Sequence, residues 1–213
     1  MKDGMKKYVV ELIGTFFLVL TIGCVVLKPG DAGDMAPLAI GAALMVMIFA
    51  GGYISGAHYN PAVTLAVWLR GKFATADLPG YIVAQVAGAA LAAVVVLFLK
   101  ESRPTPVPQA HILQALLAEF LFTFALCYVV LNVATAKGTS GNPTYGLAIG
   151  FTVLAGAYSV GAISGGAFNP AVAVGVTIMG LSSIMDIWIF LLANFAAGAA
   201  AAFTFKFLNP GDV

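Results

Sequence analysis

The stretch SGAHYNPAV at residues 55–63 recurs as SGGAFNPAV at residues 164–172. Both copies begin with Ser-Gly, end with Asn-Pro-Ala-Val and stand in strongly apolar surroundings. Asn is a favoured N-cap of a helix, and Pro suits the first helical turn because the N–H that it lacks would have no partner there. Each copy therefore predicts that a helix begins at its proline, Pro61 or Pro170.

The composition indicates that these motifs lie in a membrane. Apolar residues make up 61% of the 213 residues, charged residues only 9%, and the mean hydropathy is +1.00, whereas a soluble domain is typically about a quarter charged. A net charge of +1 without runs of like charge offers no surface for nucleic acid, so no such partner is expected. Cys24 and Cys127 lie in apolar runs and are expected to be core residues rather than disulfide partners.

Six apolar runs approach the length of about 20 residues that a helix needs to cross a bilayer. They are residues 8–27, 37–53, 79–99, 110–131, 145–162 and 185–207, and the first is interpreted as a span rather than a cleavable signal. Two shorter runs, 61–69 and 170–179, begin at the motif prolines and reach only about halfway at about 1.5 Å per residue. The prediction is an all-α membrane protein with six transmembrane helices and two re-entrant half-helices.

The placement of lysine and arginine predicts the orientation, because cytoplasmic loops carry an excess of both. With the N-terminus in the cytoplasm, three basic residues fall outside: Lys28, Lys100 and Arg103. Seven then fall inside: Lys2, Lys6, Lys7, Arg70, Lys72, Lys137 and Lys206. Both termini are therefore expected on the cytoplasmic side of a prokaryotic inner membrane, with the first half-helix entering from the cytoplasm and the second from outside.

The two halves of the chain repeat one another. Glu11 lies 49 residues before Asn60, and Glu119 lies 50 residues before Asn169; in both cases Thr-Phe closely follows the glutamate. Hydrophobic runs recur by chance, but a glutamate within a span and an Asn-Pro-Ala at matched spacing do not easily do so. Because three spans separate the two half-helices, the predicted repeats, residues 1–107 and 108–213, have opposite orientations in the membrane.

With these features the chain resembles the aquaporin and glycerol-facilitator (major intrinsic protein) family over nearly its whole length. The stretches that carry the resemblance are ELIGTF at 11–16, HYNPAV at 58–63, YIVAQVAG at 81–88 and AFNPAV at 167–172. The resemblance implies six tilted helices around a pore, two half-helices that meet at mid-membrane, and a homotetramer with one pore per subunit. It implies no cofactor, and it implies a channel rather than an enzyme.

The residues that unwind before each motif are expected to line the pore. Irregular backbone survives inside a bilayer only where it is buried in protein or lines a water-filled cavity. Asn60 and Asn169 are expected to cap their half-helices and to turn an amide N–H toward the lumen. Two helix N-termini, each about half a positive charge, then meet and repel cations. The other motif residues are Pro61, Ala62, Pro170 and Ala171, and the expected carbonyl acceptors are those of Gly56, Ala57, His58, Tyr59, Gly165, Gly166, Ala167 and Phe168.

Three buried polar residues and one histidine need an interpretation. Glu11 and Glu119 are candidates for a proton relay, as ionisable residues in spans often are. The resemblance instead implies that both accept hydrogen bonds from the re-entrant loops, and that Gln85 also anchors a loop. His58 is either a ligand or proton shuttle, or it packs near the inner side of the pore. Since His111 is the only other histidine, no metal site is expected.

The chain departs from the family at the outer constriction. Most members carry Arg directly after the second Asn-Pro-Ala, and here that residue is Val172. Matching the remaining filter positions without gaps selects Ile40, Ala157 and Gly166, so this ring has neither an aromatic nor a charged side chain. Ala173 stands where glycerol facilitators carry Asp, and Asn194 where many members have Pro.

The prediction is a passive channel for water and small uncharged solutes such as glycerol, urea, ammonia or neutral metalloid acids. An inverted-repeat secondary transporter is the alternative, since that class also places broken helices at mid-membrane. Coupled transport would need a titratable or ion-binding group at the centre, and only the two glutamates qualify. An intramembrane enzyme is a weaker alternative, because Ser55 and Ser164 have no plausible base other than His58.

Overall fold

The computed structural model describes residues 2–106 and 108–212, and within these residues it contains helices and no strands. The predicted repeat boundaries at residues 1, 107 and 213 lie outside the described residues. The six long helices are α1 (Lys2–Val26), α2 (Ala36–Ser55), α4 (Leu78–Lys100), α5 (Ile112–Val130), α6 (Tyr145–Ser164) and α8 (Ile187–Leu208). The two short ones are α3 (Pro61–Arg70) and α7 (Pro170–Ile178). Short helical turns cover Gly33–Met35, Thr75–Asp77, Leu131–Thr135, Lys137–Thr139 and Ile184–Asp186.

All six long helices are long and apolar enough to cross a bilayer, so the predicted all-α membrane fold is confirmed. The fourth span differs from its prediction, because α5 begins two residues later than expected and continues beyond Val130 as the π-helical turn Leu131–Thr135. Side chains compete for the helix carbonyls there: Asn132 Nδ2 donates to the Tyr128 carbonyl, and Thr135 Oγ1 to the Leu131 carbonyl. Such local hydrogen bonds offer the backbone an alternative to the regular ladder.

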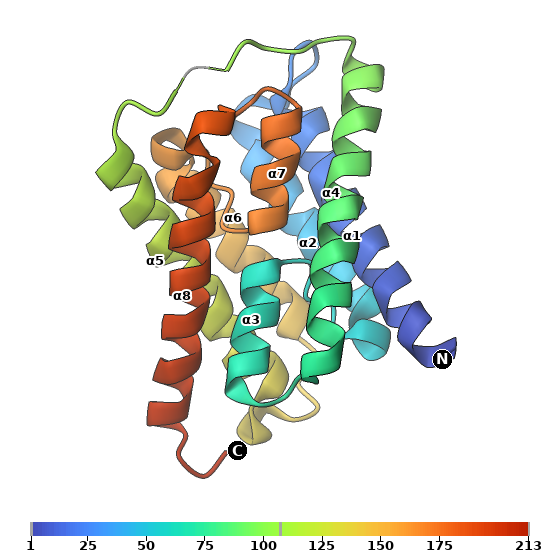
Figure 1. The fold of residues 1–213 in the computed structure, drawn as a ribbon, viewed down its shortest axis with the longest axis vertical. Coiled ribbons are helices and arrows are strands. Elements are labelled where there is room, and N and C mark those ends of the chain that lie inside the picture. The colour runs from blue at the N-terminus through green and yellow to red at the C-terminus, as the bar shows by residue number, and fades with distance from the viewer. Residues whose placement is uncertain (1, 107, 213) are drawn as a thin grey trace.

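The long helices follow one another around the bundle, and the two short ones lie between α8 and α4 (Figure 1). Helix α1 packs against α2 and α4, α2 against α6, and α5 against both α6 and α8. Helices α3 and α7 each pack against α4 and α8, and in Figure 1 they lie end to end with their N-termini facing each other at mid-height. We call the end of the bundle with residues 101–106 and 108–111 the loop end, and the end where α1 begins and α8 finishes the terminal end.

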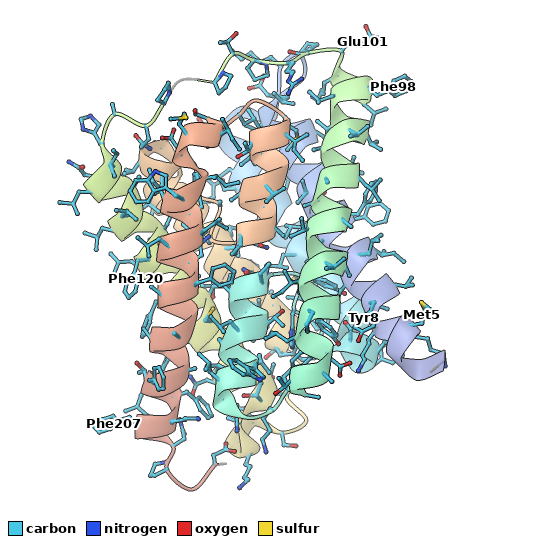
Figure 2. The ribbon with its side chains drawn as sticks, in the orientation of Figure 1. Met5, Tyr8, Phe98, Glu101, Phe120 and Phe207 are labelled. Atoms are coloured by element: carbon cyan, nitrogen blue, oxygen red, sulfur yellow. The ribbon has the colours of Figure 1, made fainter. Side chains whose placement is uncertain are left out.

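Helices α2 and α6 approach each other through glycine. A Cβ added to Gly41 would lie 2.8 Å from the Gly150 carbonyl oxygen, and one added to Gly150 would lie 2.6 Å from the Gly41 oxygen. Small residues allow such close backbone contact between membrane helices. The outer surface carries large apolar side chains instead; Figure 2 shows Phe98 and Phe207 pointing away from the bundle near its two ends, where they are 80% and 83% exposed.

Candidate functional site: a channel between two half-helices

The two half-helices begin in the same way, because the asparagine before each proline caps the first turn. Asn60 Oδ1 accepts hydrogen bonds from the N–H groups of Ala62 at 2.8 Å and Val63 at 3.4 Å. Asn169 Oδ1 accepts the equivalent bonds from Ala171 at 2.9 Å and Val172 at 3.4 Å. Each side-chain oxygen therefore satisfies two of the N–H groups that a helix N-terminus leaves without partners.

The amide nitrogens of these caps join the two re-entrant loops. Asn60 Nδ2 donates to the Phe168 carbonyl at 2.9 Å, and Asn169 Nδ2 donates to the Tyr59 carbonyl at 2.8 Å. Two of the eight carbonyls expected to serve a permeating molecule thus accept from the protein itself. An amide carries two N–H donors, so each asparagine keeps a second one, and both asparagines line the central cavity.

Glu11, on α1, holds the first re-entrant loop. Its Oε1 accepts hydrogen bonds from Ser55 Oγ at 2.7 Å and the His58 N–H at 2.9 Å. Its Oε2 accepts from the Tyr59 N–H at 2.7 Å and Gln85 Nε2 at 2.8 Å. The side chain of Glu11 is fully buried. A single carboxylate on α1 therefore satisfies two loop amides, and Gln85 on α4 supports it.

Glu119, on α5, holds the second loop in the same manner. Its Oε1 accepts from Ser164 Oγ at 2.7 Å and the Ala167 N–H at 3.0 Å, and its Oε2 accepts from the Phe168 N–H at 2.7 Å. The loops that Glu11 and Glu119 hold contain strained backbone. Phe168 has φ 48°, and Ala57 and Tyr59 in the first loop have φ 51° and 49°. These values lie in the left-handed region, which residues other than glycine rarely adopt.

Asn194 is a polar core residue whose place the sequence indicates only indirectly. It lies 25 residues after Asn169, and Gln85 lies 25 residues after Asn60, so the two are equivalent in the repeat. Asn194 is fully buried, and its Oδ1 accepts from Thr123 Oγ1 at 2.8 Å. Its side-chain nitrogen interacts with the Glu119 carboxylate, although outside ordinary hydrogen-bond geometry. This equal spacing is the sequence signal that identifies Asn194 as the counterpart of Gln85 in the second repeat.

His58 belongs to a small polar cluster beneath the first asparagine. The Thr64 hydroxyl donates to the Asn60 carbonyl at 3.0 Å, accepts from Gln85 Nε2 at 3.0 Å and lies 3.1 Å from His58 Nδ1. Which of the two groups donates in the contact between His58 Nδ1 and the Thr64 hydroxyl depends on the tautomer of the ring. The ring packs beside Phe73 and lines the cavity. No group of three or more potential metal ligands occurs among the described residues.

A cavity of about 460 Å³ runs from the loop end to the paired asparagines. All four residues that the sequence assigned to the constriction line it: Ile40, Ala157, Gly166 and Val172. Most of the remaining lining is aliphatic. A second cavity of about 660 Å³ opens at the terminal end; Gly56 lines this one and not the first. The first cavity is lined by both re-entrant loops, and the second reaches the first loop at Gly56.

Two residues that line the first cavity were missed in the sequence: Gln109 and Asp186, at the loop end. The backbone N–H of Gln109 donates to Asp186 Oδ2 at 2.8 Å, and its Nε2 donates to the Ile163 carbonyl at 2.9 Å. These contacts fasten the α4–α5 loop to the start of α8. Gln109 and Asp186 lie 77 positions apart, and neither residue belongs to a motif.

A charged cluster lies at the terminal end. Arg70 is the last residue of α3, its side chain is buried, and its Nη2 lies 2.7 Å from Asp212 Oδ1. Arg70 also donates to Thr135, and its guanidinium stacks 4.6 Å from the Phe205 ring. Asp212 Oδ2 accepts from the Lys137 N–H at 2.6 Å. That backbone N–H, with the Arg70 guanidinium, holds the pKa of the Asp212 carboxyl below its usual value.

Comparison with known proteins agrees with this arrangement. The family model of the major intrinsic protein matches residues 2–205. The chain is 35% identical to "Aquaporin NIP1-4" of Oryza sativa subsp. japonica, over 98% of this chain and 79% of the relative. It is also 35% identical to "Glycerol uptake facilitator protein-like 6" of Lactiplantibacillus plantarum, over 98% of this chain and all of the relative.

A solved structure supports the fold. The aquaglyceroporin from Plasmodium falciparum superposes with a TM-score of 0.81, covering 97% of this chain and 98% of that one at 22% identity. Six membrane-spanning helices, two capped half-helices meeting at their N-termini and a family match from residue 2 to residue 205 lead to one conclusion. The chain is a multi-pass integral membrane protein of the major intrinsic protein family.

Proposed function

We propose that this chain admits uncharged solutes of the size of glycerol or urea through an apolar constriction. Its family consists of passive channels for water and small solutes and not of enzymes. One observation carries the proposal. Val172 follows the second Asn-Pro-Ala and lines the cavity together with Ile40, Ala157 and Gly166, where relatives commonly place an arginine. None of these four side chains carries a charge or a hydrogen-bond donor.

The physical consequence of this ring is a difference in selectivity. An arginine in a narrow ring occupies space and donates hydrogen bonds to a solute, so it restricts passage by size and by chemistry. A valine does neither. Without the arginine the ring is wider, so it admits uncharged solutes that are larger than water. Glycerol, urea, ammonia and neutral metalloid acids are the solutes that we propose.

Charge exclusion is assigned to the centre of the pore. The N-termini of α3 and α7 face each other there, and each carries roughly half a positive charge. The second N–H of Asn60 and of Asn169 is available to a water or a hydroxyl in the cavity, and the free carbonyls of Gly56, Ala57, His58, Gly165, Gly166 and Ala167 supply acceptors. Such a barrier is described for aquaporin-type pores in general.

We also propose the setting in which the channel works. The excess of basic residues in the loops of the terminal end favours cytoplasmic termini, and the relative from Lactiplantibacillus plantarum favours a prokaryotic inner membrane. The matched anchors Glu11 and Glu119 support two inverted repeats, residues 1–107 and 108–213. A homotetramer with one pore per subunit is the assembly that the family resemblance suggests. Native mass spectrometry from lipid nanodiscs tests it, and a monomer would contradict it.

Stopped-flow light scattering on proteoliposomes tests the proposed selectivity. Vesicles are exposed to gradients of water, glycerol and urea, and empty vesicles provide the baseline. We expect all three to permeate faster than in empty vesicles, with solute rates that rise linearly with concentration and do not respond to proton or sodium gradients. Water flux without glycerol or urea flux would contradict the wide apolar constriction, and saturating flux that follows a gradient would contradict a passive channel.

A further inference from the structure

The cavity has a polar group outside the predicted ring, at its loop-end mouth. Asp186 directly precedes α8, lines the cavity and is only 8% exposed. No lysine or arginine lines this cavity among the described residues, and Asp186 is the one carboxylate that does.

The contacts of Asp186 fix its carboxylate and occupy only one of the two oxygens. Oδ2 accepts the backbone N–H of Gln109 at 2.8 Å, and Gln109 is itself tied to the end of α6 through the Ile163 carbonyl. Oδ1 accepts no hydrogen bond from any of the described residues. A carboxylate oxygen has room for about two donors, so Oδ1 remains a fixed, solvent-accessible acceptor at the mouth of an apolar cavity.

This free acceptor lies where a solute has to give up water. Glycerol or urea loses hydrogen bonds when it leaves bulk water for the ring of Ile40, Ala157, Gly166 and Val172, and none of those side chains replaces them. A hydrogen bond to a charged acceptor is roughly twice as strong as one between neutral groups. The same charge disfavours anions.

We propose that Asp186, positioned by Gln109, forms an outer subsite that accepts an O–H or N–H of an uncharged polyol or amide and so lowers the barrier to its entry. This inference rests on the proposed function and adds a specificity-determining residue to it. In place of the donor that an arginine would supply at the ring, the channel offers an acceptor at the mouth. Solutes are thus selected for the donors that they carry.

Two substitutions separate the subsite from a structural role. In Asp186→Asn, the remaining oxygen can still accept the Gln109 N–H, and the amide nitrogen then occupies the free position, so the acceptor is replaced by a donor while the loop stays fastened. Asp186→Leu removes both functions and keeps the branching at Cγ. Asp34→Asn is the control, since Asp34 is an exposed aspartate at the same end of the bundle and does not line the cavity.

The measurement is glycerol, urea and water flux in the same proteoliposome preparations, with circular dichroism to confirm folding. We expect Asp186→Asn to lower glycerol and urea flux roughly tenfold relative to water flux, the factor that corresponds to losing one hydrogen bond to a charged group. Asp186→Leu should show a loss at least as large, and Asp34→Asn none.

The outcomes distinguish the subsite from the proposed function beneath it. An unchanged ratio of glycerol to water flux in a folded Asp186→Asn channel overturns the subsite and leaves the proposed function intact. Equal losses of glycerol and water flux also overturn it, because they indicate a blocked or distorted mouth. Failure of the unmodified channel to pass glycerol and urea refutes the proposed function itself.

Discussion

Val172 is the single residue on which the proposed selectivity depends most. It follows Asn169 by three positions, and its N–H donates to the side-chain oxygen of Asn169. Val172 is 3% exposed and lines the cavity. The backbone is therefore held by the motif, and a substitution at this position changes the ring with little effect on the half-helix. This separation makes Val172 suitable for a direct test.

Val172→Arg is expected to narrow the ring and to place a donor and a positive charge in it. Glycerol and urea flux should fall about tenfold, which corresponds to about 1.4 kcal/mol of added barrier, while water flux falls less. Stopped-flow assays of all three in one preparation measure the ratio. An equal fall for water and glycerol, in a protein that folds normally, would show that Val172 is not part of the constriction.

The buried carboxylates allow a second test at the residue scale. Glu119 accepts three hydrogen bonds, two on Oε1 and one on Oε2. Glu119→Gln keeps the two on Oε1 and leaves the Phe168 N–H without an acceptor, whereas Glu119→Leu leaves all three donors unsatisfied at about 1–3 kcal/mol each. Thermal unfolding in detergent should therefore rank wild type above Gln and Gln above Leu.

The flux assay completes that test. If Glu119 only anchors the second loop, folded Glu119→Gln retains most of the water flux, and that flux is indifferent to a proton gradient. Abolished flux in a stably folded Gln variant, together with gradient-driven flux in the wild type, would instead indicate a proton relay.

At the scale of elements, we assign the charge barrier to the combined N-terminal dipoles of α3 and α7. Asn60 and Asn169 tie the two elements together through the carbonyls of Phe168 and Tyr59. With no arginine in the ring, this centre and the cost of dehydrating an ion are the barriers that remain. Charge insertion at a bilayer centre costs at least about 2.5–3.5 kcal/mol on insertion scales.

Asn169→Asp places a negative charge against the N-terminus of α7 and replaces a donor to the Tyr59 carbonyl with an acceptor. We expect a cation leak, measured as sodium conductance in planar bilayers, that is absent from the wild type. Asn209→Asp, beyond the end of α8, is the control. Ready sodium conduction by the wild type would show that the paired half-helices do not suffice.

The close packing of α2 against α6 depends on glycine at the contact between the two helices. Gly41→Ala would bring its Cβ within 2.8 Å of the Gly150 carbonyl oxygen, so the helices must separate. Overpacking of this kind typically costs about 1–3 kcal/mol. We expect a lower apparent melting temperature in detergent. Gly161→Ala on α6 is the matched control, because nothing lies within 4 Å of its added Cβ, and it should cause no loss.

At the scale of the whole molecule, contacts between distant segments hold the terminal end together. Arg70 at the end of α3, Lys137 in the α5–α6 loop and Asp212 beyond α8 meet in one cluster. Lys137 also lines the second cavity, so this cluster borders the route to the pore. Its strength depends on the charge of Asp212.

Asp212→Asn should lower the apparent melting temperature at neutral pH. The folded-state pKa of Asp212 is depressed, so its contribution is present above the unfolded pKa and is lost as pH falls through the folded one. The difference between wild type and variant should therefore shrink under strongly acidic conditions. Detergent-solubilised protein scanned at both pH values measures it. A difference that is independent of pH would show that the charge of Asp212 does not contribute.

The sequence by itself determined the features that depend on neighbouring residues. Span lengths follow from apolar runs, and both half-helices begin at the predicted prolines because Asn, Pro and Ala act within two or three positions of each other. The sequence also identified the equivalent residues of the two repeats, Glu11 with Glu119 and Asn60 with Asn169, because their spacing can be compared without knowledge of packing.

Only the tertiary structure decided which partners these residues have. Asn60 and Asn169 donate to carbonyls 108 and 110 positions away, so the carbonyls of Phe168 and Tyr59 serve the protein and not only the solute. Asp186 meets Gln109 across 77 positions, through residues that no motif marks. Hydrogen bonds between distant segments form only when the helices have packed, and local patterns carry no information about them.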